Sequence, residues 1–400
     1  MNILYLTARM PYPPIRGDAL VPFHRLKRLS RHHRITLLTF YESPEELNYL
    51  NKIEPYCSEI ITVKHSRWTG LLNMLEFGLF SRRPFQVLYY KSRTFKKAVK
   101  DLLENNQFDL MHVHMLRIAE YGLPCRLPKI LEMIDSMHLN IQRRVEQESF
   151  PLSWLLGLEL KRLKDYETSI ARRYGRGVVV SALDRRHIGS DNVVDIPLGV
   201  DLDRFHQVPR LTERKTIVFT GSMFYFPNEN AILWFMRHCF AGIKQRVPQV
   251  ELVIAGKDPG PAVLQLAELE GVTVTGFVED MEATLHQARV AIAPMQSGSG
   301  MQFKILDAMA CGIPVVATQL GVGAIQAEHG RDLLVAGDAE EFSDACVRLL
   351  EDNPLAEELR ESGRRLVEGM YTWEANVKRA EGLYNDVLDE NNRATSSRES

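Results

Sequence analysis

Residues 290–317 hold the spacing that most strongly indicates chemistry in this sequence. An apolar run leads into a turn of glycine and serine at 297–300, and a helical pattern follows as far as Gly312. The free amides and the dipole at the start of such a helix favour a bound phosphate. Lys304 and Asp307 are three positions apart and so share one face of the helix. The stretch therefore offers a cation for phosphate and a carboxylate for a sugar diol, although a glycine-rich turn before a helix is more often plain structure.

Two histidines near the end of a predicted strand are the second candidate. His112 and His114 alternate with apolar residues within residues 108–114. We expect the two rings to point to opposite faces, with one histidine packed in the core and the other, near the carboxyl end of the strand, directed into a cleft. An imidazole titrates near neutral pH and can bind through either ring nitrogen.

Polar residues also fall in loops that follow predicted strands. The loop at 11–18 ends in Arg16, Gly17 and Asp18, and Asp135 closes a later strand. Loops carried by a rigid scaffold are where binding residues concentrate. We assign these four residues to the side of the protein that holds an acceptor substrate, while noting that the prolines of the loop also fit a simple turn.

Asp201 and Asp203 have the Asp-x-Asp spacing that binds Mn²⁺ or Mg²⁺ in some transferases. The pair lies in a predicted linker between domains. We therefore expect no metal site there and assign the chain no metal or cofactor.

The elements that position these residues form two series of short apolar strands separated by helical patterns. Strand and helix alternate throughout, and the strands are rich in β-branched residues, which is typical of a doubly wound parallel sheet. The first series holds 2–7, 35–40, 60–63, 110–114, 129–134, 178–181 and 193–196, and the second 216–220, 250–255, 272–275, 290–293 and 315–317. The pattern predicts an α/β protein of two Rossmann-like domains facing a central cleft, with ligands at the carboxyl ends of the strands.

The polar break after residue 205 sets the predicted domain boundary. We place the first domain at 1–205 and the second at 206–372. A helix at about 373–390 is expected to pack back on the first domain, and the polar residues 391–400 are expected to be disordered.

Composition and cysteine usage restrict the class of protein. Of the 400 residues, 45% are hydrophobic and 25% charged, which fits a globular protein and excludes wholesale disorder. Five scattered cysteines without a CxxC pair argue against disulfides and structural zinc. The first residues lack a basic signal region, and no apolar run reaches the roughly 18 residues of a membrane span. These features predict a cytoplasmic protein.

Charge is distributed unevenly along the chain. Residues 1–200 hold 30 basic and 21 acidic residues, whereas residues 201–400 hold 19 and 30. Residues 64–100 alone carry nine basic side chains against one acid, interleaved with apolar and aromatic residues such as Trp68 and Phe80. Such a segment predicts peripheral contact with the anionic inner face of the plasma membrane, and a core-facing helix with a solvated basic edge is the alternative. No pattern typical of nucleic-acid binding is present.

Five ordered motifs resemble those of glycosyltransferase family 4, the retaining sugar transferases of the GT-B fold that build exopolysaccharides and lipid-linked glycans. The segment from Asp307 to Val315, Asp-Ala-Met-Ala-Cys-Gly-Ile-Pro-Val, is similar to the second half of the donor-binding motif of the family. The other four motifs are Phe108–His114, Ile196–Phe205, Val218–Met223, and Gly276–Val278 with Asp280. The resemblance spans residues 2 to about 385 and implies the GT-B fold and transfer with retention of configuration.

The resemblance also assigns roles to residues. It implies that His114 donates a hydrogen bond to the donor sugar. The implied donor-binding residues are Gly221, Ser222, Asn228, Gly276, Val278, Ser299, Gly300, Lys304 and Asp307. Two departures stand out: Ser299 replaces the first glutamate of the family pattern, and the usual basic pair after Gly221 is missing. We infer that Lys304 replaces that pair and opposes the charge of the departing diphosphate, which makes His114 and Lys304 the predicted catalytic residues.

These observations predict a sugar transferase that moves a glycosyl group from a nucleotide diphosphate sugar to a glycan or lipid-linked acceptor in surface polysaccharide assembly. The alternatives are a catalytically inactive nucleotide-sugar-binding protein and a GT-B nucleotide-sugar epimerase. A dinucleotide-dependent dehydrogenase is disfavoured, because residues 4–12 contain no GxGxxG after the first strand.

Overall fold

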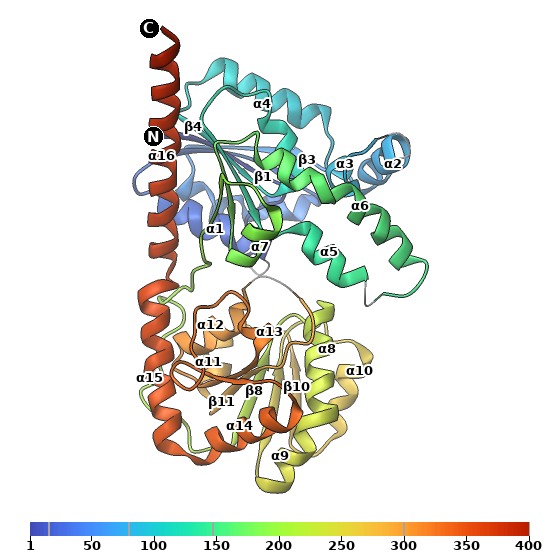
Figure 1. The fold of residues 1–400 in the computed structure, drawn as a ribbon, viewed down its shortest axis with the longest axis vertical. Helices are drawn as coiled ribbons and strands as arrows, with labels where there is room; N and C mark the ends of the chain where they lie inside the picture. The colour runs from blue at the N-terminus through green and yellow to red at the C-terminus, as the bar shows by residue number, and fades with distance from the viewer. Residues whose placement is uncertain (15–16, 79–80, 146–147, 299–300, 400) are drawn as a thin grey trace. The chain divides into compact units, whose positions relative to one another are not determined.

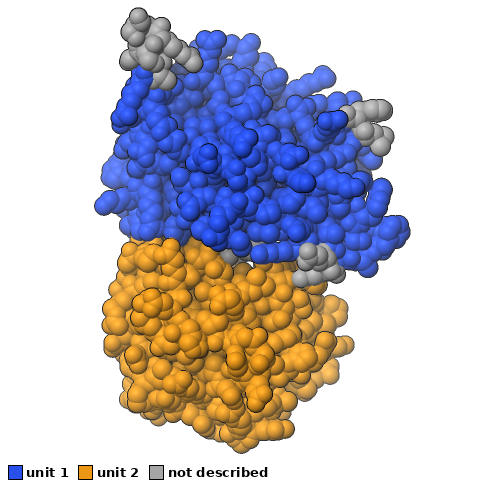
Figure 2. Space-filling view, viewed as in Figure 1, with its two compact units in different colours: residues 1–197, 373–400 blue, residues 198–372 orange. Residues whose placement is uncertain are grey.

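The computed structural model describes residues 1–14, 17–78, 81–145, 148–298 and 301–399, with side chains as far as residue 393. The chain forms two compact units, which Figure 2 colours separately. Unit 1 comprises residues 1–197 and 373–400, and unit 2 comprises residues 198–372. Each unit is built on one parallel sheet flanked by helices, so the predicted α/β class with two doubly wound sheets is confirmed.

Unit 1 has a seven-stranded parallel sheet in the order β3-β2-β1-β4-β5-β6-β7. Its strands are β1 (Asn2–Thr7), β2 (Arg34–Tyr41), β3 (Glu59–Lys64), β4 (Leu110–His114), β5 (Lys129–Ile134), β6 (Arg176–Val179) and β7 (Val193–Asp195). Its α-helices are α1 (Gly17–Leu29), α2 (Arg67–Gly78), α3 (Phe85–Tyr89), α4 (Arg93–Asn105), α5 (Met137–Val145), α6 (Leu152–Ala171), α7 (Ala182–Ile188) and α16 (Trp373–Glu399). Short 3₁₀ helices lie at Pro44–Lys52, Glu54–Tyr56 and Leu116–Gly122. The strand order reverses between β1 and β4, where such sheets open a crevice for ligands.

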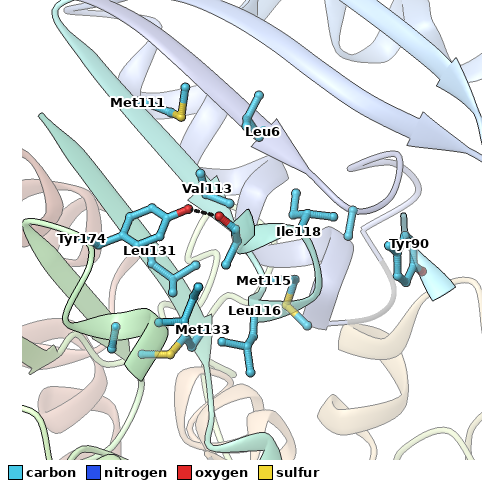
Figure 3. Close-up of a cluster of buried hydrophobic side chains, with 14 of the residues drawn as sticks. Leu6, Tyr90, Met111, Val113, Met115, Leu116, Ile118, Leu131, Met133 and Tyr174 are labelled. Carbon is cyan, nitrogen blue, oxygen red and sulfur yellow. Dashed lines mark hydrogen bonds between the residues drawn. The ribbon is translucent and has the colours of Figure 1, made fainter. Parts of the chain in front are cut away.

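Alternate residues of the same strands build two cores on opposite faces of this sheet. One core contains Leu4 and Leu6 of β1 and is covered by α4 and α6. Figure 3 shows part of it, where the Tyr174 hydroxyl donates a hydrogen bond to the Ala119 carbonyl. The other core contains Ile3 and Tyr5 and is covered by α1 and α16, which lie side by side (Figure 1). The period of two along each strand thus determines which helices a side chain meets.

Unit 2 has a six-stranded parallel sheet in the order β10-β9-β8-β11-β12-β13. Its strands are β8 (Thr216–Thr220), β9 (Glu251–Ala255), β10 (Val272–Gly276), β11 (Val290–Ala293), β12 (Val315–Thr318) and β13 (Leu334–Ala336). Its α-helices are α8 (Phe226–Phe235), α9 (Ala241–Arg246), α10 (Pro261–Leu264), α11 (Met281–His286), α12 (Phe303–Ala310), α13 (Gln319–Val322), α14 (Ala339–Glu351) and α15 (Asn353–Met370); Met236–Phe240 forms a π-helical turn and Gln265–Glu268 a 3₁₀ helix. The order reverses between β8 and β11, which places this crevice beside the glycine turns singled out in the sequence.

The boundary between the units differs from the predicted one. Residues 198–205, predicted to close the first domain, belong to unit 2. The Val200 amide donates to the Tyr371 carbonyl at 2.7 Å, and Arg364 Nη1 donates to the Phe205 carbonyl at 3.0 Å. These contacts with the end of α15 hold the segment, whereas the polar composition after residue 205 only marks a surface loop.

The C-terminal tail also differs from the prediction. Helix α16 continues as far as Glu399, so residues 391–399 are helical and not disordered. Adding residues to an existing helix is far less costly than nucleating one, and this helix is nucleated and packed well before residue 391. Within the described ranges, no helix has the length and apolar character that crossing a bilayer requires.

We expect the packing of α16 to be essential to unit 1. Tyr384 is fully buried in the second core. Replacing Tyr384 with Ala should lower the free energy of unfolding by about 3–5 kcal/mol, the usual cost of removing a buried aromatic ring. Urea unfolding measures this change. Lys378→Ala, at an exposed position of the same helix, is the control and should change stability by less than about 0.5 kcal/mol; equal effects would contradict the packing described here.

Candidate active site

The carboxyl ends of the central strands of unit 2 approach one another so closely that only glycine fits. Gly221 follows β8 and Gly256 follows β9. A Cβ atom on Gly256 would lie 1.7 Å from the carbonyl oxygen of Gly221, and a Cβ on Gly221 would lie 2.7 Å from Nδ2 of Asn228. Both glycines have positive φ angles, 149° and 156°. Glycine is therefore required at both positions by the close approach of the protein's own backbone and of Asn228.

Asn228, near the start of α8, joins the two turns that were assigned to the donor. Its Nδ2 donates to the Ser222 carbonyl at 2.9 Å, and its Oδ1 accepts from Lys304 Nζ at 2.6 Å. Ser222 thus contributes its main-chain carbonyl to this network. The side chain of Asn228 is 7% exposed, so both bonds are shielded from water. The structure brings these predicted donor residues together through an amide where a basic pair was missing from the sequence.

Lys304, in the first turn of α12, is a buried cation. Its side chain is 9% exposed, and Nζ lies 4.0 Å from the centre of the Phe219 ring and 3.7 Å from Met295 Sδ. Among the described residues, no carboxylate forms an ion pair with it. Burial lowers the pKa of the ammonium group to about 7. An ammonium group in such surroundings favours an anionic ligand that would supply the missing charge.

Asp307 lies one turn after Lys304 on α12 and is half-buried. Burial raises the pKa of its carboxyl group to about 7, and the charge of Arg204 opposes that rise. That this carboxyl group accepts hydrogen bonds from a diol stays a prediction. Lys304 and Asp307 therefore present opposite polarities on one helix face without neutralising each other.

The end of β10 supplies the remaining predicted donor residues. Gly276 has a φ of +68°, its carbonyl accepts from the Gly256 amide at 3.0 Å, and Val278 is half-buried. Between them, the Phe277 ring is 62% exposed and so offers an open aromatic face. Asp280 caps α11 by accepting from the Ala283 amide at 2.9 Å, which is a structural role. Ser299 and Gly300 lie outside the described residues.

In unit 1, His112 and His114 lie on the same face of β4, and both contact Glu132 of β5. His114 Nδ1 is 2.9 Å and His112 Nε2 is 3.2 Å from Oε2 of Glu132. The prediction that the two rings point to opposite faces is wrong, because residues two apart in a strand share a face. Both histidines are fully buried, and His114 is at the carboxyl end of the strand as predicted.

Glu132 is the centre of this polar cluster, and sequence reasoning missed it. Its Oε1 accepts from Arg25 of α1 at 2.8 Å, and the two side chains are 2% and 1% exposed. The net effect of this guanidinium and of the two histidine hydrogen bonds is to hold the pKa of Glu132 well below its ordinary value in spite of burial. Burial also lowers the pKa of His112 to about 4. A lone glutamate in the middle of an apolar strand was the signal that could have identified it.

His112, His114 and Glu132 are close enough to be considered as metal ligands, since one ligand atom from each lies within 4.8 Å of the others. Arg25 occupies one carboxylate oxygen, however, and Tyr384 Oη bonds to His112 Nδ1 at 2.9 Å. Hydrogen bonds thus account for the position of each of these side chains without a cation. Asp201 and Asp203 belong to no such three-residue group in the described part of the chain.

The predicted acceptor residues lie at the ends of other strands of unit 1. Gly17 is the first residue of α1, and Asp18 lies 3.6 Å from Arg9 in an ion pair; Arg16 is outside the described residues. Asp135 follows β5, and burial raises the pKa of its carboxyl group to about 6.

Backbone strain marks the ends of β4 and β5. Met115 and Ile134, which immediately follow His114 and precede Asp135, have φ angles of 88° and 71°. Such angles are costly for residues with a Cβ, and most of all for a β-branched one. They tend to occur where a binding site requires a particular geometry, which agrees with a functional role for this edge of unit 1.

Comparisons with known proteins agree with this geometry. The family described as glycosyl transferases group 1 matches residues 214–352, which include every described donor residue of unit 2. The chain is a glycosyltransferase, and its residues 214–352 match this family. It is an enzyme of the hexosyltransferase type (EC 2.4) and resembles glycosyltransferase family 4, as the sequence motifs predicted.

A curated relative matches most of the glycosyltransferase, and solved structures share its fold. A phosphatidyl-myo-inositol mannosyltransferase of Mycobacterium leprae is 26% identical over 303 residues, 72% of this chain and 76% of that protein. Sucrose-phosphate synthase from Thermosynechococcus elongatus has the same fold, with a TM-score of 0.71 at 16% identity over 98% and 100% of the two chains. HepE from Anabaena, crystallised with UDP and glucose, has a TM-score of 0.67 at 15% identity over 96% and 100%. The GT-B fold is therefore confirmed.

The buried charge of Lys304 makes a prediction about stability and binding. Replacing Lys304 with Met should leave the unliganded glycosyltransferase as stable or more stable, because a buried charge without a counter-ion is costly. Its affinity for a nucleoside diphosphate should fall about 10- to 100-fold, as for a lost charge-assisted hydrogen bond. Calorimetry and thermal unfolding measure the two effects. Arg237→Met, an exposed substitution in unit 2, is the control.

The difference in stability between the wild type and the Lys304→Met variant should depend on pH in a definite direction. The pKa of Lys304 is about 7 when folded, against an ordinary value of 10.5. Between pH 7 and 10.5 the Lys304 side chain is protonated in the unfolded chain but largely neutral in the folded one. The unfolded state therefore binds more protons, and the free energy of unfolding of the wild type increases as the pH rises. The stability advantage of the Met variant should be largest below pH 7 and fade toward pH 10. An advantage that grows with pH would contradict a buried Lys304 that has no carboxylate partner among the described residues.

Proposed function

We propose that this glycosyltransferase moves a hexosyl group from a nucleoside diphosphate sugar to a glycan or lipid-linked acceptor, with retention of configuration, in the assembly of surface polysaccharide or glycolipid on the cytoplasmic side of the membrane. The observation that carries the proposal is the buried Lys304 ammonium group, held by Asn228 at the carboxyl ends of β8 and β11.

Lys304 acts on the diphosphate in this proposal. Cleavage of the bond between the anomeric carbon and the phosphate oxygen leaves negative charge on the departing diphosphate. A cation already in place, in surroundings that exclude water, stabilises that charge without having to reorganise. Binding of the diphosphate also raises the pKa of Lys304 from about 7, so that the side chain is fully charged when the bond breaks. Asp307 accepts hydrogen bonds from the ribose diol of the same donor.

The acceptor hydroxyl supplies the attacking oxygen. In a retaining transfer it approaches the face from which the diphosphate leaves, and its proton can pass to the departing phosphate oxygen. Asp135, with its carboxyl pKa raised to about 6 by burial, is the unit 1 residue to which we assign binding of the acceptor. The family resemblance supports retention, and no residue of unit 2 is assigned as a covalent nucleophile.

The relatives support both substrates. The Mycobacterium leprae relative is named for mannosyl transfer to phosphatidyl-myo-inositol, a lipid acceptor, and the HepE structure contains UDP and glucose. These names support a nucleotide sugar as donor and a lipid-linked glycan as acceptor. They leave both UDP- and GDP-sugars as donors to be tested.

Transfer should require no metal ion, because Lys304 supplies the positive charge at the diphosphate. We expect one nucleotide sugar from a UDP- and GDP-sugar series to raise the melting temperature and to be consumed with a lipid-linked or glycan acceptor. The rate should persist in EDTA. Loss of transfer in EDTA with recovery on adding Mg²⁺ would contradict the role of Lys304. Donor consumption that needs no acceptor would contradict transfer.

The surface of α2 supports contact with a membrane. Trp68, Leu72 and Leu75 are 76%, 62% and 71% exposed, and the only buried residues of the helix are two glycines. This arrangement favours the interfacial prediction for residues 64–100 over packing in the core. Phe77 is half-buried, with Lys91 Nζ 3.3 Å from the centre of its ring, so it is not free to insert as predicted. Phe80 lies outside the described residues.

Basic side chains near α2 in the sequence match an anionic surface. Arg82, Arg93 and Lys96 are exposed, and each such residue contributes about 1 kcal/mol close to an anionic membrane. The exposed apolar side chains of α2 add a contribution that salt does not screen. We therefore propose reversible, peripheral binding through α2 and the basic residues that follow it.

Vesicle sedimentation tests this surface. Trp68→Ser with Leu72→Ser and Leu75→Ser should reduce binding to anionic vesicles severalfold at high salt, where charge is screened. Arg82→Gln with Arg93→Gln and Lys96→Gln should reduce binding at low salt. Leu183→Ser, at a position 45% exposed on α7, is the matched control. Equal binding to neutral and anionic vesicles, or a large loss of stability in the first variant, would contradict the proposal.

A further inference from the structure

His114 has one ring nitrogen that the protein leaves without a partner. Its Nδ1 is bonded to Glu132, but Nε2 is buried and has no hydrogen-bond partner in the described part of the chain. Buried polar atoms are nearly always paired, so an orphan in a native structure calls for an explanation. His114 pairs with Thr7 across the junction of β4 and β1, where the strand order of unit 1 reverses. A ligand in the crevice at this junction is the natural partner.

The hydrogen bonds of Glu132 determine which nitrogen of His114 carries a proton. The Arg25 guanidinium is always a donor, and it holds Oε1 at 2.8 Å. An ionised carboxylate can only accept, so the two histidine nitrogens that face Oε2 must both be donors. The proton of His114 therefore lies on Nδ1. A neutral His114 ring then directs an unprotonated Nε2 at its ligand.

The other members of the cluster hold Glu132 in this state. Neutral His112 donates from Nε2 to Glu132, and its Nδ1 accepts from the Tyr384 hydroxyl at 2.9 Å. Arg25 is fixed by Asn376, whose Oδ1 accepts from Arg25 Nε at 3.1 Å. Histidine, tyrosine and asparagine side chains can each donate or accept, but the Arg25 guanidinium only donates and the ionised Glu132 only accepts, so the ion pair sets the direction of these bonds.

We propose that Glu132 is a positioning residue that fixes His114 as the Nδ1–H tautomer, so that Nε2 accepts a hydrogen bond from a sugar hydroxyl. An unprotonated nitrogen attracts an O–H group and repels a phosphate or carboxylate oxygen, which identifies the ligand group by its chemistry. That the hydroxyl belongs to a sugar rests on the proposed function. The polarity is the reverse of that expected from the sequence, where His114 was to donate.

Substituting glutamine for Glu132 tests the proposal sharply. The amide NH₂ cannot face Arg25, because both are donors, and so must turn toward the histidines. His114 Nδ1 then has to accept, which moves its proton to Nε2. Imidazole ¹⁵N NMR should show Nδ1–H in the wild type and Nε2–H in Glu132→Gln, with His114→Asn assigning the signals. The turnover rate kcat should fall at least tenfold, on the scale seen when the partner of a functional histidine is changed, while affinity for the nucleoside diphosphate stays the same.

Tyr384→Phe is the matched control, since it removes a hydrogen bond from the same buried cluster while leaving Glu132 facing His114. It should keep the Nδ1–H signal. If Glu132→Gln does not fold, the wild-type spectrum alone still decides, because a proton on Nε2 in the wild type would overturn the proposal. An unchanged tautomer and kcat in a folded Glu132→Gln variant would overturn it as well.

Titrations of the wild type identify the source of the hydroxyl. The His114 Nε2 signal should move with the nucleotide sugar if the donor supplies the hydroxyl, or with a glycoside acceptor analogue if the acceptor does. A response to the nucleoside diphosphate alone would overturn the assignment to a sugar hydroxyl. If no nucleotide sugar binds and no transfer occurs, the proposed function fails, whereas the tautomer result for Glu132 stands independently.

Discussion

The Arg25–Glu132 ion pair is buried so completely that the protein's own groups have to offset the loss of water around its charges. Removing two charges from water is costly and is offset only by good geometry and further hydrogen bonds. Here those bonds come from β4, through both histidines, and from α16, through Asn376 and Tyr384. The pair therefore specifies how α1, β4, β5 and α16 fit together. It also leaves Nε2 of His114, at the strand end, without a hydrogen-bond partner among the residues that the structure describes.

Unit 2 treats its buried charge in the opposite way. Lys304 has an amide, a thioether and an aromatic ring as neighbours, and among the described residues no carboxylate pairs with it. Its full positive charge is favourable only when an anion arrives. Unit 1 thus pairs its buried charges with each other, and the pair orients the His114 ring. Unit 2 instead leaves the Lys304 charge to be paired by a bound anion. An oriented, neutral imidazole suits an uncharged sugar hydroxyl, and an ammonium group without a carboxylate partner suits a diphosphate.

The fold could be predicted from the sequence because strand and helix alternate so regularly. All seven strands of unit 1 and five of the six in unit 2 were expected, and the omission was β13, a three-residue edge strand too short to show a pattern. Lys304 and Asp307 were found because helical spacing alone places them on one face. Glu132 and the bridging role of Asn228 were missed, since both depend on contacts between residues 18 to 107 positions apart or 76 positions apart. For Asn228 such a contact leaves no local trace in the sequence, and for Glu132 the local signal is a single glutamate within an apolar strand.

The return of the chain to unit 1 constrains the order in which the protein can be made. Unit 2 is continuous, but the second core of unit 1 needs Tyr384 and Val387 of α16, nearly 200 residues after the end of β7. Synthesis proceeds at about 5–20 residues per second, so many seconds pass between the synthesis of residues 1–197 and that of α16. During this time the apolar face of α1 and one face of the unit 1 sheet are uncovered. Unit 2 is complete before that face is closed. The nascent chain therefore exposes the Arg25 and Glu132 side of its first sheet to water and to chaperones until α16 emerges.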